Sequence, residues 1–139
     1  LAELPCRVVA NPDHARGQWT SVRAGIRAVQ AHAGTPAAVL MLADMPFVTT
    51  DMLATLVRHH RDSGAPLVVS QYGEIQAPPT LYARPLFAEL ASAEGPGCGK
   101  AVVRRHREAA ETVSWPAERL DDVDVPDDYD RAKSRIPVG

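Results

Sequence analysis

The chain has 139 residues and a mass of 15.0 kDa, with 45% apolar residues, 23% charged residues and a formal net charge of −2. This length is typical of one compact domain. The longest apolar run, Pro36 to Ala43, covers about eight residues, far short of the roughly 20 that span a bilayer, so we expect no membrane partner. The 15 basic residues are scattered among 17 acidic ones, which argues against nucleic acid as a partner.

The two cysteines, Cys6 and Cys98, form neither a CxxC pair nor a disulfide framework. This usage is typical of a reducing compartment, and we therefore expect a cytoplasmic protein. The sequence begins at Leu1 and lacks the charged-then-apolar pattern of a secretory signal.

The first third of the sequence predicts strands that alternate with a helix. The apolar run Cys6–Ala10 predicts a buried strand. Apolar residues at helical spacing from Val22 to Ala33 predict a helix, which Thr20 or Ser21 would cap. The continuous apolar run of residues 37–43 predicts a strand that is covered on both faces, as in a parallel sheet.

The rest of the sequence continues this alternation. Residues 49–51 predict the cap of a second amphipathic helix, and Tyr72-Gly73-Glu74 predicts a turn. The prolines of the strand expected at Pro79–Ala83 favour an edge position. Together these elements predict an α/β domain with a mostly parallel, mixed sheet. Further strands are expected at Pro66–Ser70 and Glu111–Trp115, and further helices at Pro85–Ala91 and Lys100–Arg107.

The segment most indicative of function is Leu42-Ala43-Asp44-Met45-Pro46, in which a carboxylate follows an apolar strand. The carboxyl ends of strands are where open α/β sheets bind ligands. Burying a carboxylate without a partner costs several kcal/mol, so Asp44 should be paired, exposed or bound to a metal. A hard divalent cation, above all Mg²⁺, fits a single carboxylate that shares the ion with substrate phosphates. The alternative is a turn or helix-cap aspartate.

A second carboxylate could come from the acidic segment near the C-terminus. If this segment is extended, Asp122 and Asp124 lie on one face, opposite Val123 and Val125. The alternative is a solvated acidic surface.

The glycine-rich loop before Lys100 differs from a phosphate-binding P-loop. Glu94 stands where that motif needs glycine, and Ala101 stands where it needs serine or threonine. Lys100 would approach a phosphate only as a simple cation, and an ordinary helix start is the alternative.

Four segments, in order along the chain, are similar to the MobA/MocA-like nucleotidyltransferases. Together they extend over nearly the whole sequence, which makes the resemblance fairly specific although each segment alone is weak. They are Asn11-Pro12 with Gly17-Gln-Trp-Thr-Ser21-Val-Arg-Ala-Gly25, Leu42-Ala-Asp-Met-Pro46, Pro78-Pro79-Thr80-Leu81-Tyr82, and Asp122-Val-Asp-Val-Pro-Asp-Asp128.

The resemblance implies a three-layer α/β/α domain related to the nucleotide-binding fold of sugar-nucleotide enzymes. It implies transfer of CMP or GMP from CTP or GTP to the phosphate of molybdopterin, with release of pyrophosphate and with Mg²⁺ as cofactor. The Leu-Ala-Asp-Met-Pro segment favours the cytidylyltransferase branch. The implied site residues are Asp44 (catalytic, nucleotide-binding and metal ligand), Gly17 and Ser21 (nucleotide), Asp122 or its rival Asp124 (metal), and Gln76 and Pro79 (acceptor).

The sequence also departs from the family pattern. Gln76-Ala77-Pro78-Pro79 stands in place of Arg-Gly-His-Pro, and the loop before Lys100 lacks Asp-Lys-Gly-Ala. The family's N-terminal glycine-rich loop is absent, so we expect about 60 residues of the domain to precede Leu1, and 1–139 alone to be inactive. Two other interpretations stay open. One is a nucleotidyltransferase for a sugar phosphate or another phosphate ester, and the other is a non-catalytic cofactor-binding or chaperone domain for a molybdoenzyme client.

Overall fold

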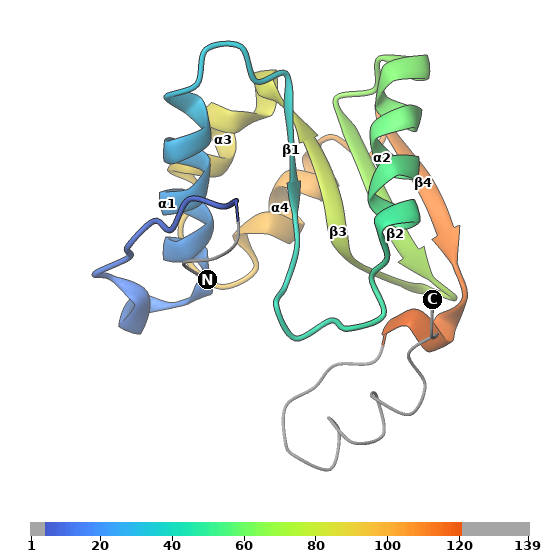
Figure 1. Cartoon of the computed structure of the whole chain (residues 1–139), viewed down its shortest axis with the longest axis horizontal. Coiled ribbons are helices and arrows are strands. Elements are labelled where there is room, and N and C mark those ends of the chain that lie inside the picture. Colours follow the sequence, from blue (N-terminus) through green and yellow to red (C-terminus); the bar gives the residue numbers. More distant parts are fainter. Residues whose placement is uncertain (1–4, 121–139) are drawn as a thin grey trace.

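The computed structural model describes residues 5–120, which contain one four-stranded sheet of order β1-β3-β2-β4 (Figure 1). Strand β3 is antiparallel to both β1 and β2, whereas β4 is parallel to β2, so all strands except β3 run in the same direction. This mixed sheet confirms the predicted α/β class. The strands are β1 (Ala37–Leu40), β2 (Leu67–Tyr72), β3 (Ile75–Ala83) and β4 (Ala110–Trp115).

Helices cover both faces of the sheet, which gives the three-layer arrangement that the sequence predicted (Figure 1). Helices α1, α3 and α4 pack on one face, and α2 packs on the other. Side chains alternate between the two layers along β2, because successive residues of a strand point to opposite faces. The helices are α1 (Gln18–Gln30), α2 (Thr50–Ser63), α3 (Phe87–Ser92) and α4 (Cys98–Arg105), with short 3-10 helices at His14–Arg16, Arg84–Leu86 and Ala117–Leu120.

The two faces of the sheet form separate cores. Leu67 and Val69 of β2 pack with the side chains of α1, α3 and α4, whereas Val68, which lies between them, packs with Leu56 of α2. Helix α2 begins as predicted, since the Thr49 hydroxyl accepts a 3.2 Å hydrogen bond from the Met52 N–H group.

The predicted strand at Cys6–Ala10 is wrong. This segment is irregular, pairs with no strand within residues 5–120, and leaves Val8 71% exposed. An apolar run forms a strand only when a neighbouring strand satisfies its backbone groups. Strand β1 is also shorter and less covered than expected, ending at Leu40 with all its residues half-buried, because it lies at an edge of the described sheet.

The predicted cap of α1 is wrong as well. The helix begins at Gln18 with Gly17 at the N-cap, so Thr20 and Ser21 lie inside its first turn. Both hydroxyls accept 2.9 Å hydrogen bonds from the Asn11 side-chain amide, and the Thr20 hydroxyl donates a 2.6 Å bond to the Gly17 carbonyl. The sequence predicted Thr20 or Ser21 as the cap, whereas the residue at the N-cap is a glycine with φ of +131°.

Strand β3 lies between two other strands, so the edge position predicted for its prolines is wrong. The pairing of β2 with β3 is regular up to Ser70↔Ala77 and resumes at Val68↔Leu81. Pro78 and Pro79 fall inside this irregularity, and pairing with β1 stops at Thr80. A central strand therefore accommodates two residues without N–H groups because no ladder bond is required of them.

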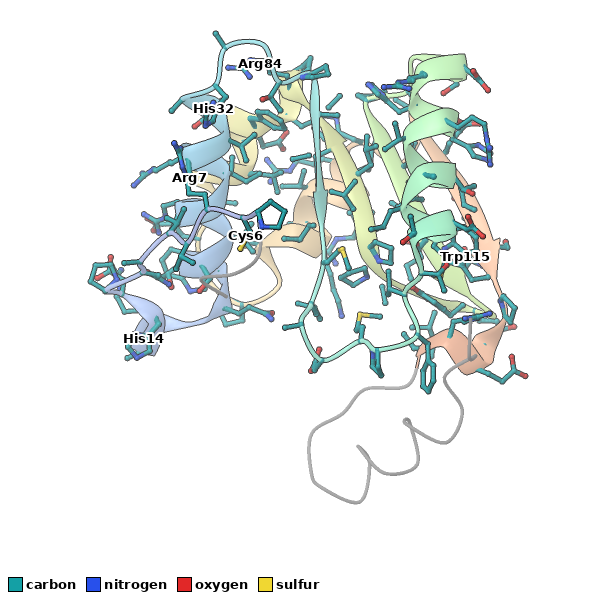
Figure 2. All side chains as sticks on the ribbon, viewed as in Figure 1. Cys6, Arg7, His14, His32, Arg84 and Trp115 are labelled. Carbon is teal, nitrogen blue, oxygen red and sulfur yellow. The ribbon has the colours of Figure 1, made fainter. Side chains whose placement is uncertain are left out.

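Arg84 directly follows β3, and its side chain bonds to the chain at the end of α1 (Figure 2). Its guanidinium donates bonds of 2.8–2.9 Å to the carbonyl oxygens of Gln30, His32 and Thr35. Arg7 contacts the His32 ring at 3.0 Å on the same side. A cation at a helix C-terminus satisfies carbonyl groups that the helix leaves open. Helix α1 is thereby held against the sheet.

No helix between residues 5 and 120 combines the length and the apolar character needed to cross a membrane.

Candidate functional site

A cavity of about 850 Å³ opens between the first turn of α1, the sheet and the loop that leads into α4. The sequence elements that meet here are far apart along the chain, and the sheet brings them together. The lining residues are Gly17, Gln18, Trp19, Val22, Leu40, Leu42, Val69, Ser70, Ile75, Gln76, Ala77, Pro78, Thr80, Tyr82, Gly95, Pro96, Gly97, Cys98, Gly99, Lys100, Val103 and Arg104.

The charge of the cavity wall is entirely positive. Lys100 and Arg104, both from α4, are its charged lining residues, and the lining contains no aspartate or glutamate within the described part of the chain. Apolar side chains also line the cavity, among them Trp19, Val22 and Leu42. Such a combination favours an anionic ligand with an apolar or aromatic body.

Gly17 shapes the α1 side of the cavity. Its φ of +131° is unfavourable for other residues, and a Cβ atom there would lie 2.9 Å from the Trp19 ring. The Trp19 ring can therefore lie against the helix start, where the Arg16 and Arg23 guanidinium groups lie 5.4 and 4.5 Å from its centroid. Arg23 also forms a 3.5 Å ion pair with Glu94, next to the glycine-rich loop.

Asp44 lies in a turn four residues after the end of β1. Its Oδ1 atom is buried and has no hydrogen-bond partner among residues 5–120. An uncompensated buried carboxylate oxygen is unfavourable, and a bound cation would compensate it. The residue therefore fits a metal ligand better than the turn or cap aspartate that the sequence left as the alternative.

No cluster of three or more His, Cys, Asp or Glu side chains within residues 5–120 could hold a metal ion by itself. Asp44 would accordingly need ligands from a bound substrate or from elsewhere in the chain. The predicted second metal ligand, Asp122, and its rival Asp124 lie outside the described residues.

The structure brings some of the predicted site residues together and separates others. Gly17 and Gln76 line the same cavity, although they were predicted for different substrates. Asp44 does not line that cavity, although Leu42 does. Ser21 is exposed and bonded to Asn11, and the buried Pro79 presents its carbonyl oxygen to the Ser70 hydroxyl.

Trp19 and Tyr82 line the cavity but were not singled out individually from the sequence. Both stand inside segments that carry the family resemblance, Trp19 two residues after Gly17 and Tyr82 at the end of Pro78–Tyr82. Proximity to these segments was the available signal.

A model of the MobA-like NTP transferase domain matches residues 1–110. The chain belongs to the MobA-like NTP transferase family. Among curated proteins, it is 30% identical to the molybdenum cofactor cytidylyltransferase of Escherichia coli, over 92% of the chain and 62% of that protein. It is 28% identical to the purine catabolism protein PucB of Bacillus subtilis, over 87% of the chain and 58% of that protein.

Among solved structures, the chain is similar to Rv0371c of Mycobacterium tuberculosis in complex with manganese. The TM-score is 0.56 and the identity 30%, over 77% of the chain and 57% of that protein. The chain spans about three fifths of the length of the curated relatives it matches.

Proposed function

We propose that the protein containing this chain is a Mg²⁺-dependent nucleotidyltransferase. It would transfer CMP from CTP, or GMP from GTP, to the phosphate of molybdopterin, and release pyrophosphate. Membership of the MobA-like family supports the reaction class. The observation that carries the proposal is Asp44, whose buried Oδ1 atom follows the first strand of the sheet and lacks a partner within residues 5–120.

Asp44 would hold the divalent cation through Oδ1, with Asp122 or Asp124 as the second carboxylate. When bound, the cation would neutralise charge on the phosphate oxygens during transfer. The Rv0371c structure with manganese is that of a related protein and supports a divalent metal at this fold. An oxygen of the acceptor phosphate would attack the α-phosphorus in line, and pyrophosphate would leave on the opposite side, without a protein nucleophile.

The chain's own residues would orient the substrates. The start of α1 would contact the nucleotide, with Gly17 giving the backbone close approach and Ser21 in the first turn of the helix. Gln76 lines the same cavity as Gly17 and would contact the acceptor. Pro79 would act on the acceptor wall only through its position in β3, since it is buried.

A second acceptor class is supported by the sequence at residues 76–79. The cytidylyltransferase and PucB, at 30% and 28% identity, carry different functional names. The residues at 76–79 also differ from the Arg-Gly-His-Pro pattern of the cytidylyltransferases. The alternative is therefore nucleotidyl transfer to a sugar phosphate or another small phosphate ester.

The test is a pyrophosphate-release assay of the complete protein with CTP or GTP, with Mg²⁺, and with molybdopterin or other phosphate esters. We expect Asp44→Asn to reduce turnover at least 100-fold, the scale typical of losing one electrostatic contact to a transition state. The matched control is Asp62→Asn, which changes an exposed aspartate near the end of α2. Wild-type turnover in Asp44→Asn would refute the assignment.

A further inference from the structure

Tyr82 carries a hydroxyl group at the cavity that residues 5–120 leave without a hydrogen-bond partner. The side chain is 3% exposed and lines the cavity, and no hydrogen-bond partner for its hydroxyl exists within residues 5–120. The hydroxyls on the neighbouring strand behave differently, because Ser70 donates to the Pro79 carbonyl at 2.6 Å and Tyr72 donates to the Pro78 carbonyl at 2.8 Å. The Tyr82 hydroxyl is open to the cavity, so its hydrogen-bond partner would come from a ligand or water bound there.

The Tyr82 hydroxyl lies beside the first turn of α4. A Cβ atom at Gly99 would lie 4.0 Å from the Tyr82 oxygen, so the glycine leaves this approach open. The loop enters the helix through Gly97 at φ +76°. In the described part of the chain, the Cys98 and Ala101 N–H groups bond to Gly95 and Gly97, whereas those of Gly99 and Lys100 have no backbone acceptor.

The cavity around Tyr82 offers several hydrogen-bond donors. They are the Tyr82 hydroxyl, the open N–H groups of α4, and the cations of Lys100 and Arg104, which line the same cavity. Burial raises the pKa of Tyr82 to about 12, with a further contribution from Cys98, so the hydroxyl keeps its proton at physiological pH. A helix N-terminus with a neighbouring cation attracts anions, and the extra donor makes this corner suited to a phosphate.

We propose that Tyr82 and the first turn of α4 bind the phosphate monoester of the acceptor substrate. The identity of the ligand rests on the proposed function, whereas the donor set by itself favours an anion. The acceptor is favoured over the nucleotide because Tyr82 lies on β3 together with Gln76, which the family resemblance assigns to the acceptor, whereas Gly17, assigned to the nucleotide, precedes α1. The apolar side chains of Val22, Leu42 and Trp19 in the cavity suit the rest of a ring-containing phosphate ester.

The test uses inorganic phosphate as the probe and the amide signals of Gly99 and Lys100 in ¹⁵N NMR spectra as the readout. We expect phosphate to shift both signals saturably in the wild type, and Tyr82→Phe to weaken the affinity about five- to tenfold, the usual effect of one hydrogen bond to a charged group. The matched control is Tyr72→Phe, which removes a buried hydroxyl outside the cavity and should leave the affinity unchanged.

The phosphate titration of the wild type needs no variant. It therefore tests the proposal even if a substitution impairs folding. Absence of saturable shifts at Gly99 and Lys100 would overturn the proposal, as would equal phosphate affinity in Tyr82→Phe and wild type. Lys100→Gln gives a second variant on an exposed side chain and should also weaken binding.

The source of the phosphate is resolved by transferase kinetics of the complete protein. We expect Tyr82→Phe to raise the KM for the acceptor and to leave the KM for CTP or GTP unchanged. The reverse pattern would overturn the assignment to the acceptor. A protein that binds phosphate at Tyr82 but transfers no nucleotide would refute the proposed function and not this site.

Discussion

The Ser70 hydroxyl on β2 donates a 2.6 Å hydrogen bond to the carbonyl oxygen of Pro79 on β3. The bond lies where the pairing of the two strands is interrupted, and Tyr72 makes the equivalent bond to Pro78. Side-chain hydroxyls thus satisfy the proline carbonyl groups where the strand pairing is interrupted. This arrangement stabilises the part of β3 that lines the cavity, which includes Gln76 and Pro78.

Replacing Ser70 by alanine should destabilise the protein. The substitution leaves the buried Pro79 carbonyl without its donor, which costs about 1–3 kcal/mol. Denaturant unfolding of Ser70→Ala and wild type would measure this difference. Ser92→Ala is the control, because that exposed hydroxyl bonds to a carbonyl of its own helix and should change the free energy of unfolding by under about 0.5 kcal/mol. Equal losses in both variants would contradict the role given to Ser70.

Replacing Gly17 by alanine should disturb the start of α1. The new methyl group would lie 2.9 Å from the Trp19 ring, on a residue whose φ is +131°. We expect a loss of about 1–3 kcal/mol in the free energy of unfolding, together with a change in Trp19 fluorescence. Gly34→Ala is the matched control, since no atom lies within 4 Å of its added Cβ. An unchanged unfolding free energy in Gly17→Ala would show that the close approach is not required.

Removing the charge of Asp44 should abolish the stabilisation of the protein by divalent cations. A ligand that binds only the folded state stabilises it by RT ln(1 + [L]/Kd), so Mn²⁺ or Mg²⁺ with CTP should raise the Tm of the wild type. In Asp44→Asn this increase should disappear, while the Tm without metal should stay equal or rise, because an uncompensated buried carboxylate is lost. A thermal-shift titration measures both effects, with Asp62→Asn as control. An undiminished metal-induced shift would contradict the assignment.

Glu111 should make stability depend on pH in the acid range. The nearby Ser63 hydroxyl and the His59 ring, which contacts the carboxylate at 3.3 Å, hold the pKa of Glu111 below its ordinary value. A carboxyl group with a lowered pKa adds stability above its unfolded pKa, and the added stability is lost as pH falls through the folded pKa. Glu111→Gln should therefore have a lower Tm than the wild type near pH 7. The two Tm values should converge as the pH falls into the acid range.

The measurement is the Tm of both proteins between about pH 3 and pH 7, where carboxyl groups titrate. Glu108→Gln serves as control because that glutamate is exposed at the end of the turn before β4. A constant difference between Glu111→Gln and wild type across this range would mean that the charge of Glu111 is not involved.

The order of strands and helices could be predicted from the sequence because it depends on local patterns. Apolar runs, the Thr49 cap and the turn at Gly73 each act over a few residues, and the structure confirms them. The strand expected at Cys6–Ala10 could not be judged in this way, because a strand depends on a partner from elsewhere in the chain. The same limit explains β3, whose central position depends on an irregularity in β2 that no proline pattern reveals.

By itself, the sequence determined the α/β class, the family resemblance and the aspartate that follows the first strand of the sheet. Those features depend on short segments of the sequence, and they can be recognised without knowing which distant residues pack against them. Only the tertiary structure decided that Gly17 and Gln76 share one cavity, that the Asp44 Oδ1 atom lacks a partner within residues 5–120, and that Tyr72 is satisfied whereas Tyr82 is not. Hydrogen-bond satisfaction depends on strand register and helix packing, and these join residues that are far apart in the chain.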